Sequence, residues 1–206
     1  MSAAGFLRDP EPTAEAERLF ANDIAEVGYV MNVSRLWAYQ PALFEGLFDL
    51  MREATSAHKL TLRQRGILIA SCASALGDSY CSLAWGSKLA EAADAQTASG
   101  VLRGDDGRLT ASEQATAGWA RKIARNPSQT SAADVQTLRD VGYSDPQIFA
   151  ITAFVALRIA LSAVNDALGV LPDAAFRCTA PQAVLGAVTF GRPIDDEAAG
   201  AEYHLT

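Results

Sequence analysis

Residues 77–86 read Gly-Asp-Ser-Tyr-Cys-Ser-Leu-Ala-Trp-Gly, and they follow the apolar segment 61–76 directly. Gly77 interrupts the apolar segment, and Asp78 stands where the N-cap of a following helix belongs. Cys81 then falls in the first turn of that second helix, where the helix dipole favours a thiolate. The stretch therefore predicts two consecutive helices with a cysteine at the start of the second.

Signals for helices recur along the rest of the chain, whereas signals for strands are nearly absent. The capping box, a hydroxyl residue followed three positions later by Glu or Gln, occurs at Thr61–Gln64, Thr110–Glu113 and Ser144–Gln147. Helices are predicted over 13–27, 34–54, 61–76, about 79–93, 111–125, 132–141 and 146–169, and a Gly/Asp-rich loop over 99–108. The sequence thus predicts an all-α protein with a single domain, 13–173, and an irregular C-terminal arm and tail, 174–206.

Length and charge exclude several classes of function. At 206 residues the chain is long enough for one well-buried core. Its formal net charge of −7 disfavours binding to nucleic acid and to anionic membranes, because both need a basic face. No apolar run in the sequence approaches the roughly 20 residues of a spanning helix, and residues 1–12 lack the layout of a signal peptide. We therefore expect a cytoplasmic protein without a membrane partner.

The sequence shows neither a disulfide framework nor a metal site. Its three cysteines are widely spaced and odd in number, and Cys72 lies in an apolar run typical of a buried thiol. Cys178 lies beyond the predicted domain, which leaves Cys81 as the candidate reactive thiol. No group of His, Cys or carboxylates has the spacing of metal ligands, and no glycine-rich phosphate loop is present. We therefore expect neither a metal nor another cofactor.

The order of these segments resembles the AhpD-like and carboxymuconolactone decarboxylase superfamily, in particular its peroxidase-related branch. The helix–Gly-x-x-Tyr-Cys–helix arrangement at 77–81 carries the resemblance, which extends over roughly residues 15–194. Supporting segments are Gly28–Asn32 followed by Pro41, Leu60–Arg65, Leu138–Asp145, Asn165–Val170 and Ala187–Pro193. The resemblance implies the all-helical AhpD-like fold, assembly as a homo-oligomer (a trimer or hexamer), and an antioxidant oxidoreductase of the alkylhydroperoxidase type.

Active members of that family use a relay of a glutamate, two cysteines and a histidine. The relay makes a thiolate that attacks a peroxide, and the second cysteine resolves the sulfenic acid as a disulfide. Position by position, these four groups fall on Gly66, Asp78, Cys81 and Trp85. Only one thiol of the C-x-x-C-x-x-x-H pattern is left, so the two-cysteine cycle cannot run within this motif.

Two catalytic functions remain open. In one, the protein reduces hydroperoxides with Cys81 as the working thiol and an external thiol as the resolving partner. In the other, it carries out acid–base chemistry like the family's decarboxylases, with Asp78 or His58 as the proton-transfer group. The structural alternatives are a capping role for Asp78, an inert packed thiol at Cys81 and a surface position for His58.

A third function is non-redox: the protein binds a small organic ligand, or serves as a structural oligomer. The candidate pocket residues are Trp85, Gly66 and Arg158. A tryptophan can stack on an aromatic ligand, although on an amphipathic helix it is more often part of a core or interface. A non-redox role would need no thiolate, which suits a motif that has lost its proton relay.

Arg158 interrupts a helix, 146–169, that is otherwise apolar on every face. Such a helix is central to a fold or to an oligomer, and a buried guanidinium needs a partner. We expect Arg158 to be buried and paired with a carboxylate, with Asp78 and Asp166 as candidates; the alternative is that it binds an anion in a pocket. The apolar excess of this helix and of 61–76 also predicts an obligate homo-oligomer, with 174–194 beside a neighbouring subunit.

Overall fold

The computed structural model describes residues 5–56 and 58–196, and within these residues every regular element is a helix. The α-helices are α1 (Ala14–Val27), α2 (Asn32–Trp37), α3 (Pro41–Ser56), α4 (Leu62–Leu76), α5 (Ser79–Ala92), α6 (Ala95–Arg103), α7 (Ala111–Arg125), α8 (Ala132–Asp140), α9 (Asp145–Ala167), α10 (Phe176–Thr179) and α11 (Gln182–Leu185). A single 3-10 turn, η1 (Pro127–Gln129), precedes α8. The predicted all-α class is confirmed.

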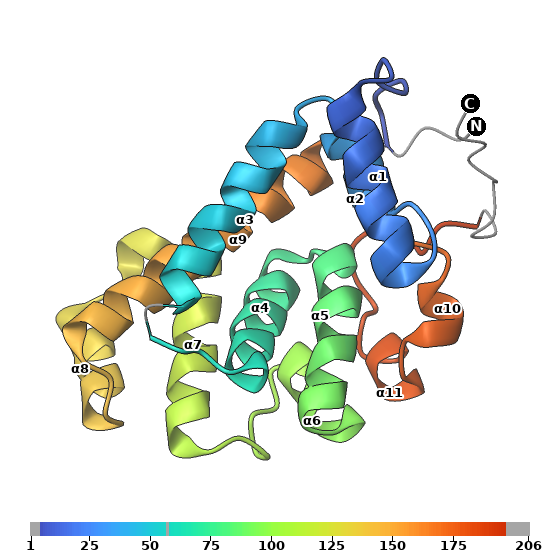
Figure 1. Ribbon diagram of the computed structural model, residues 1–206. Coiled ribbons are helices and arrows are strands. Elements are labelled where there is room, and N and C mark those ends of the chain that lie inside the picture. The colour runs from blue at the N-terminus through green and yellow to red at the C-terminus, as the bar shows by residue number, and fades with distance from the viewer. Residues whose placement is uncertain (1–4, 57, 197–206) are drawn as a thin grey trace.

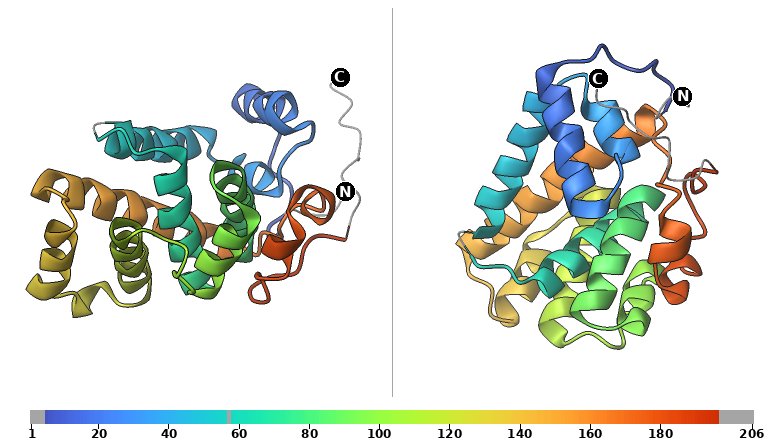
Figure 2. Two further views of the ribbon diagram at one scale, coloured as in Figure 1. Left: turned by 90° about the horizontal axis from the view of Figure 1, so that it is seen from below. Right: turned by 45° about the vertical axis from the view of Figure 1, so that its right-hand side comes forward.

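The helix α4 lies at the centre of the molecule, with α5 on one side and α7 on the other (Figure 1). The helices α3 and α9 lie side by side as a second layer, and both views in Figure 2 keep them together. Because α9 also contacts α4 and α7, it joins the two layers. The short helices α10 and α11 lie beside α5 and α6 at the opposite end of the molecule from α8.

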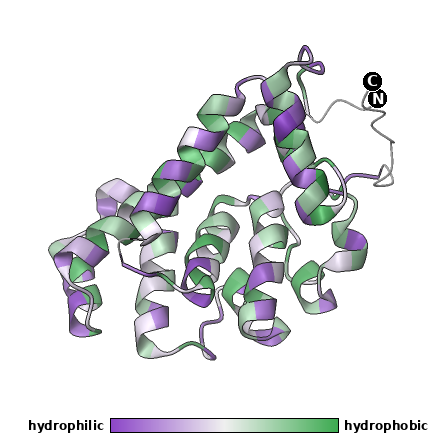
Figure 3. Ribbon diagram, viewed as in Figure 1, coloured by the Kyte–Doolittle hydropathy of each residue, from purple (hydrophilic) through white to green (hydrophobic). Residues whose placement is uncertain are grey.

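The buried apolar residues form two clusters that meet at α4. Leu68 and Ile69 of α4 belong to a larger cluster with α2, α3, α7 and α9, and Ile67 and Ala70 belong to a smaller one with α5, α6 and α11. The hydrophilic residues of α4 are gathered at its N-terminal end (Figure 3). A helix that is apolar on all sides in this way must be surrounded by other elements, which explains its central position.

The helix boundaries follow the capping signals of the sequence. Both residues of the predicted capping boxes at Thr61 and Thr110 exchange their hydrogen bonds, and a further box occurs at Ser131. The predicted break at Gly77 is confirmed, since this residue ends α4 in the left-handed conformation with φ = 80°. Asp78 follows it as the N-cap of α5.

Three expectations need correction. The predicted loop 99–108 begins inside a helix, α6, which Asp94 caps by accepting from the N–H groups of Gln96 and Thr97. The single predicted helix 34–54 is two helices, because Pro41 begins α3. The arm from residue 174 is less irregular than expected: it contains α10 and α11, and Val184 of α11 is fully buried against α5 and α6 of the same chain.

The helix α9 also corrects the expectation that no apolar run could span a membrane. Among the described residues it is the one helix that is long and apolar enough to do so by length and composition. Its residues Ile151, Phe154 and Val155 lie in the core, and Arg158 is buried as well. The arrangement of α9 is that of a core helix in a soluble helical protein.

Two buried carboxylates hold the turn between α1 and α2 against the rest of the molecule. Asp173 accepts hydrogen bonds from the Asn32 N–H at 2.7 Å and from the Tyr80 hydroxyl at 2.6 Å. Asp23 accepts from the Met31 N–H at 2.9 Å. Burial raises the pKa of Asp23 to about 6, although its hydrogen bonds oppose the shift. Burial likewise raises the pKa of Asp173 above its ordinary value.

The stability of the protein should therefore increase in mild acid. Asp23 binds its proton more tightly in the folded chain than in the unfolded chain, so its contribution is fully present below its ordinary pKa and is lost as the pH rises through about 6. Between pH 7.5 and pH 5 this residue should add about 1 kcal/mol to the free energy of unfolding. We expect Asp23→Asn to lose this increment in urea unfolding, and Glu45→Gln, on the exposed side of α3, to keep it. Equal pH slopes for Asp23→Asn and wild type would contradict the prediction.

Candidate functional site

Cys81 lies in the first turn of α5, and Asp78 caps that helix. The Cys81 N–H donates to Asp78 Oδ1 at 2.9 Å, as the sequence predicted for an N-cap. The Asp78 side chain is fully buried, and only 3% of the Cys81 surface is exposed. The cysteine of the motif is therefore an interior residue.

The helix α9 supplies the polar side chains that face Cys81. Arg158 Nη2 lies 3.5 Å from Cys81 Sγ, and Arg158 Nη1 lies 3.8 Å from Met51 Sδ on α3. One turn later, the Ser162 hydroxyl donates to Asp78 Oδ2 at 2.5 Å and lies 3.9 Å from Cys81 Sγ. Asp78, Cys81, Arg158 and Ser162 thus form one buried polar cluster between the start of α5 and the middle of α9.

Trp85, where the family's histidine falls, closes one side of this cluster. It is half-buried, and the Arg158 guanidinium lies 5.5 Å from the centroid of its ring. Lys88 Nζ lies 5.3 Å from the same ring. Because an indole ring attracts cations through its negative face, Trp85 stabilises the buried guanidinium. The position that carries a proton donor and acceptor in the family here carries an aromatic support for a cation.

The prediction for Arg158 is half right. Arg158 is buried, with 4% of its surface exposed, but within residues 5–56 and 58–196 no ion pair joins it to Asp78 or Asp166. The reason lies in Asp78, whose two oxygens are taken by the helix cap and by Ser162. Asp166 is joined to a different arginine through its backbone, since its carbonyl accepts from Arg192. The nearest partners of the guanidinium are two sulfur atoms and an aromatic ring.

This environment keeps Cys81 protonated. Burial raises the pKa of the Cys81 thiol, and the negative charge of Asp78 raises it further. The charge of Arg158 opposes both effects but does not overcome them, so the pKa lies well above its ordinary value. Burial also raises the pKa of Cys72 to about 12. A thiolate, the form that attacks peroxides, is therefore strongly disfavoured at both sites.

The other candidate residues lie outside this cluster. Gly66 sits in the contact between α4 and α5, where an added Cβ would lie 3.1 Å from the Cβ of Leu89. A glutamate at this position would have to displace Leu89. His58, in the turn before α4, is half-buried and forms no hydrogen bond or ion pair with another described residue. The sequence analysis missed Ser162 and Met51. Ser162 could have been found, because it lies four positions after Arg158 and therefore shares a face of the same apolar helix.

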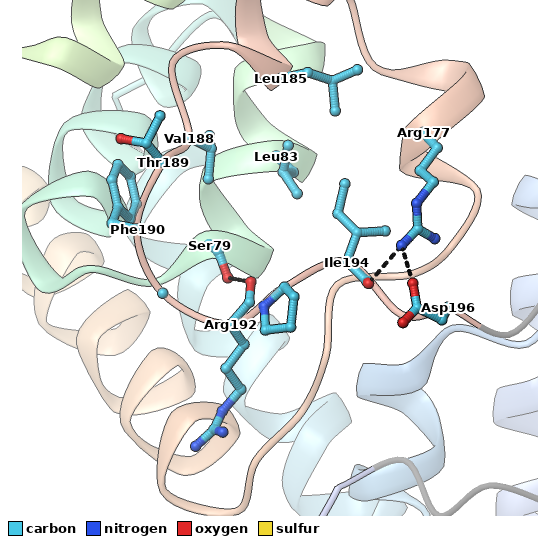
Figure 4. A pocket seen from close by; sticks show the side chains of 12 residues that line it. Ser79, Leu83, Arg177, Leu185, Val188, Thr189, Phe190, Arg192, Ile194 and Asp196 are labelled. Carbon is cyan, nitrogen blue, oxygen red and sulfur yellow. Dashed lines mark hydrogen bonds and ion pairs between the residues drawn. The ribbon is translucent and has the colours of Figure 1, made fainter.

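A separate pocket of about 460 Å³ lies between α5 and the C-terminal arm (Figure 4). Its walls come from α5, α10, α11 and the chain after α11. The lining residues are Ser79, Leu83, Arg177, Leu185, Val188, Thr189, Phe190, Gly191, Arg192, Pro193, Ile194 and Asp196. None of them belongs to the cluster around Cys81. Among the described residues, no group of three or more His, Cys, Asp or Glu is placed to hold a metal ion.

Two solved structures resemble this arrangement of helices along most of their length. An uncharacterized peroxidase-related protein from Silicibacter sp. TM1040 gives a TM-score of 0.75 at 19% identity, over 86% of this chain and 96% of that one. The AhpD core of an uncharacterized peroxidase-related protein from Ralstonia eutropha JMP134 gives 0.72 at 20% identity, over 85% and 96%. Comparison of the sequence with family models and with curated proteins finds no match. The chain therefore has the AhpD-like fold, and its resemblance to peroxidase-related proteins is confirmed at the level of the fold.

The buried hydrogen bond from Ser162 to Asp78 should make this N-cap contribute more to the free energy of unfolding than an exposed N-cap does. Replacement of an exposed N-cap by alanine costs about 1 kcal/mol, and an orphaned buried partner adds about 1–3 kcal/mol. We expect Asp78→Ala to lower the free energy of urea unfolding by about 2–4 kcal/mol. Asp94→Ala, which removes the exposed cap of α6, is the matched control and should cost about 1 kcal/mol. Because Asp94 also accepts a hydroxyl, that of Thr97, equal losses in the two variants would show that burial of the Asp78–Ser162 contact adds nothing.

Proposed function

We propose that this protein is a non-redox member of the AhpD-like group that binds a small organic ligand, and that its former redox centre now serves the structure. The observation that carries the proposal is the state of Cys81: buried, protonated and enclosed by Asp78, Arg158 and Ser162. Hydroperoxide reduction needs an accessible thiolate and a second thiol to resolve it. Neither requirement is met at this position.

The remaining thiols do not replace the missing resolving cysteine. Cys72 is buried in α4 with a raised pKa, and Cys178 is exposed on α10. Acid–base chemistry is disfavoured as well, because both oxygens of Asp78 are occupied and the carboxylate is fully buried. His58 has no hydrogen-bonding partner among the described residues that would orient it as a base.

A second candidate keeps the family's activity: thiol-dependent hydroperoxide reduction by Cys81 alone, with an external thiol as reductant. One observation favours it. Arg158 is 3.5 Å from Cys81 Sγ, and its positive charge stabilises a thiolate. A local opening would be needed to expose the sulfur, since only 3% of the Cys81 surface is exposed.

Thiol titration tests the burial of Cys81, and a peroxide assay separates the two functions. Cys178 is exposed whereas Cys72 and Cys81 are buried, so the folded protein should react rapidly with a disulfide reagent at one thiol and the denatured protein at all three. Cys178→Ser should abolish the rapid phase. Peroxide consumption with added thiol should be no faster for wild type than for Cys81→Ser. A turnover that depends on Cys81 would establish the second candidate and contradict the first.

We also propose that the protein is a cytoplasmic homo-oligomer. Apolar side chains are exposed on the α3–α9 layer: Leu43 and Leu50 are each 58% exposed, and Phe149 is 75% exposed. Exposed apolar surface on neighbouring helices favours association, and the peroxidase-related resemblance implies trimers or hexamers.

The oligomer can be tested at two of these positions, Leu50 and Phe149. In sedimentation experiments at micromolar concentration, wild type should be larger than a monomer. Leu50→Lys and Phe149→Lys should shift it toward the monomer, because a lysine buried in an interface is costly. Arg18→Glu, on the exposed side of α1, is the control for a change of surface charge. A wild-type protein that sediments as a monomer would contradict the proposal.

A further inference from the structure

We propose that the pocket between α5 and the C-terminal arm binds a small organic molecule with an apolar body and one carboxylate group. The proposal rests on the ligand-binding part of the proposed function and names its site and its chemical class. The pocket volume of about 460 Å³ is within the range of small-molecule sites, roughly 300–1,000 Å³.

Apolar side chains form the body of the pocket. Leu83 of α5 is almost fully buried and lies behind the cavity, and Leu185, Val188 and Ile194 are partly buried and surround it (Figure 4). These side chains come from three different segments that meet around one space. Such a lining favours a ligand with an apolar body, since burial of apolar surface contributes roughly 25 cal/mol per Å² to the free energy of binding.

Arg177 supplies the charge at the edge of this pocket. Its Nη2 donates to the Ile194 carbonyl at 2.9 Å and to Asp196 Oδ1 at 2.7 Å, and its Nη1 donates to the Asp195 carbonyl. The Asp196 side chain is 100% exposed, and an ion pair so exposed contributes little. A carboxylate held inside the pocket can therefore replace Asp196 on the guanidinium, whose planar N–H groups suit a carboxylate.

The second arginine of the lining does not compete for the ligand. The Arg192 guanidinium points away from the cavity in Figure 4. Its Nη2 donates to the Asp166 carbonyl at 2.9 Å, and its Cζ lies 4.8 Å from the centroid of the Phe6 ring. Arg177 is thus the cation that a ligand meets, and the ligand needs only one negative charge.

The arm that forms the outer wall is fixed in place before any ligand binds. Gly191 has φ = 73°, and a Cβ there would lie 2.4 Å from the Gly77 carbonyl oxygen, so the arm touches the turn between α4 and α5. The Ser79 hydroxyl donates to the Arg192 carbonyl at 2.8 Å next to this contact. A preformed wall lowers the entropic cost of binding.

The pocket and the buried cluster use different faces of α5. Ser79 and Leu83, four residues apart, line the pocket, whereas Cys81 and Trp85, also four residues apart, meet Arg158. Residues four apart share one face of a helix, and residues two apart do not. Ligand binding here therefore needs no opening of the redox position.

Calorimetric titration with octanoate and with 1-octanol tests the site, since the two probes share an alkyl chain and differ in charge. Octanoate should bind wild type at least about tenfold more tightly than octanol, a difference of about 1.4 kcal/mol. Arg177→Gln should abolish this preference, because it should weaken octanoate binding at least about tenfold more than octanol binding. Arg103→Gln is the matched control, because Arg103 also holds the arm through a carbonyl, that of Gly186, but does not line the pocket. Val188→Trp, which fills the cavity, should abolish binding of both probes.

The proposal is overturned if wild type does not bind octanoate at millimolar concentration, if Arg177→Gln and Arg103→Gln behave alike, or if Val188→Trp binds as wild type does. An equal loss of octanol and octanoate in Arg177→Gln also overturns the role of the charge. These failures leave the thiol experiments untouched. Conversely, peroxide turnover that depends on Cys81 would contradict the non-redox function whether or not octanoate binds.

Discussion

The carboxylate of Asp78 is the constraint on which the rest of this structure depends. One of its oxygens accepts the N–H of Cys81 and so begins α5, and the other accepts the hydroxyl of Ser162 and so fixes α9 against that helix. Its neighbour Gly77 ends α4, and the carbonyl of Gly77 is touched by the arm at Gly191. Three parts of the chain far apart in sequence therefore converge on a turn of two residues.

The charges at this point explain why Cys81 is held as a thiol within this fold. Arg158 brings a positive charge into the interior and Asp78 a negative one, so the cluster is balanced while Cys81 stays a thiol. Ionisation of Cys81 would add a second negative charge in a region with little access to water, which is why burial and Asp78 both raise its pKa. The same arrangement that satisfies the buried charges suppresses the nucleophile. A complete motif avoids this conflict, because a cysteine at position 78 would carry no fixed charge.

Much of this could be predicted from local sequence signals. The helix boundaries at Thr61, Thr110 and Gly77 and the capping role of Asp78 depend on neighbouring residues, and all four were correct. The helix α6 was missed because glycine and aspartate read as loop formers. Gly100 lies inside that helix for a steric reason, since a Cβ there would lie 2.7 Å from the Asp105 carbonyl oxygen. A close approach of this kind is visible only in three dimensions.

The partners of Arg158 and the pocket in the arm could not be predicted from the sequence either, because both depend on contacts between distant segments. That a guanidinium would meet Met51, Cys81 and Trp85 rather than a carboxylate depends on which turns of α3, α5 and α9 face one another. The burial of Arg158 was predictable, because one charge in an apolar helix leaves few alternatives. The pocket is formed largely by a segment after α11 without regular structure, where hydrophobic periodicity gives no signal.

The two faces of α5 differ in how closely the rest of the chain covers them. On the face toward α9, Asp78 is hydrogen-bonded to Ser162 and to the start of α5, and the cysteine is covered, so a ligand would have to break buried hydrogen bonds to enter. On the face toward the arm, apolar side chains remain partly uncovered beside Arg177, whose exposed ion pair costs little to exchange. The second face does not depend on the residues of the first, because the arm rests on Ser79 and Gly77 and not on Cys81 or Trp85. The pocket on the arm side is therefore built independently of the chemistry at Cys81.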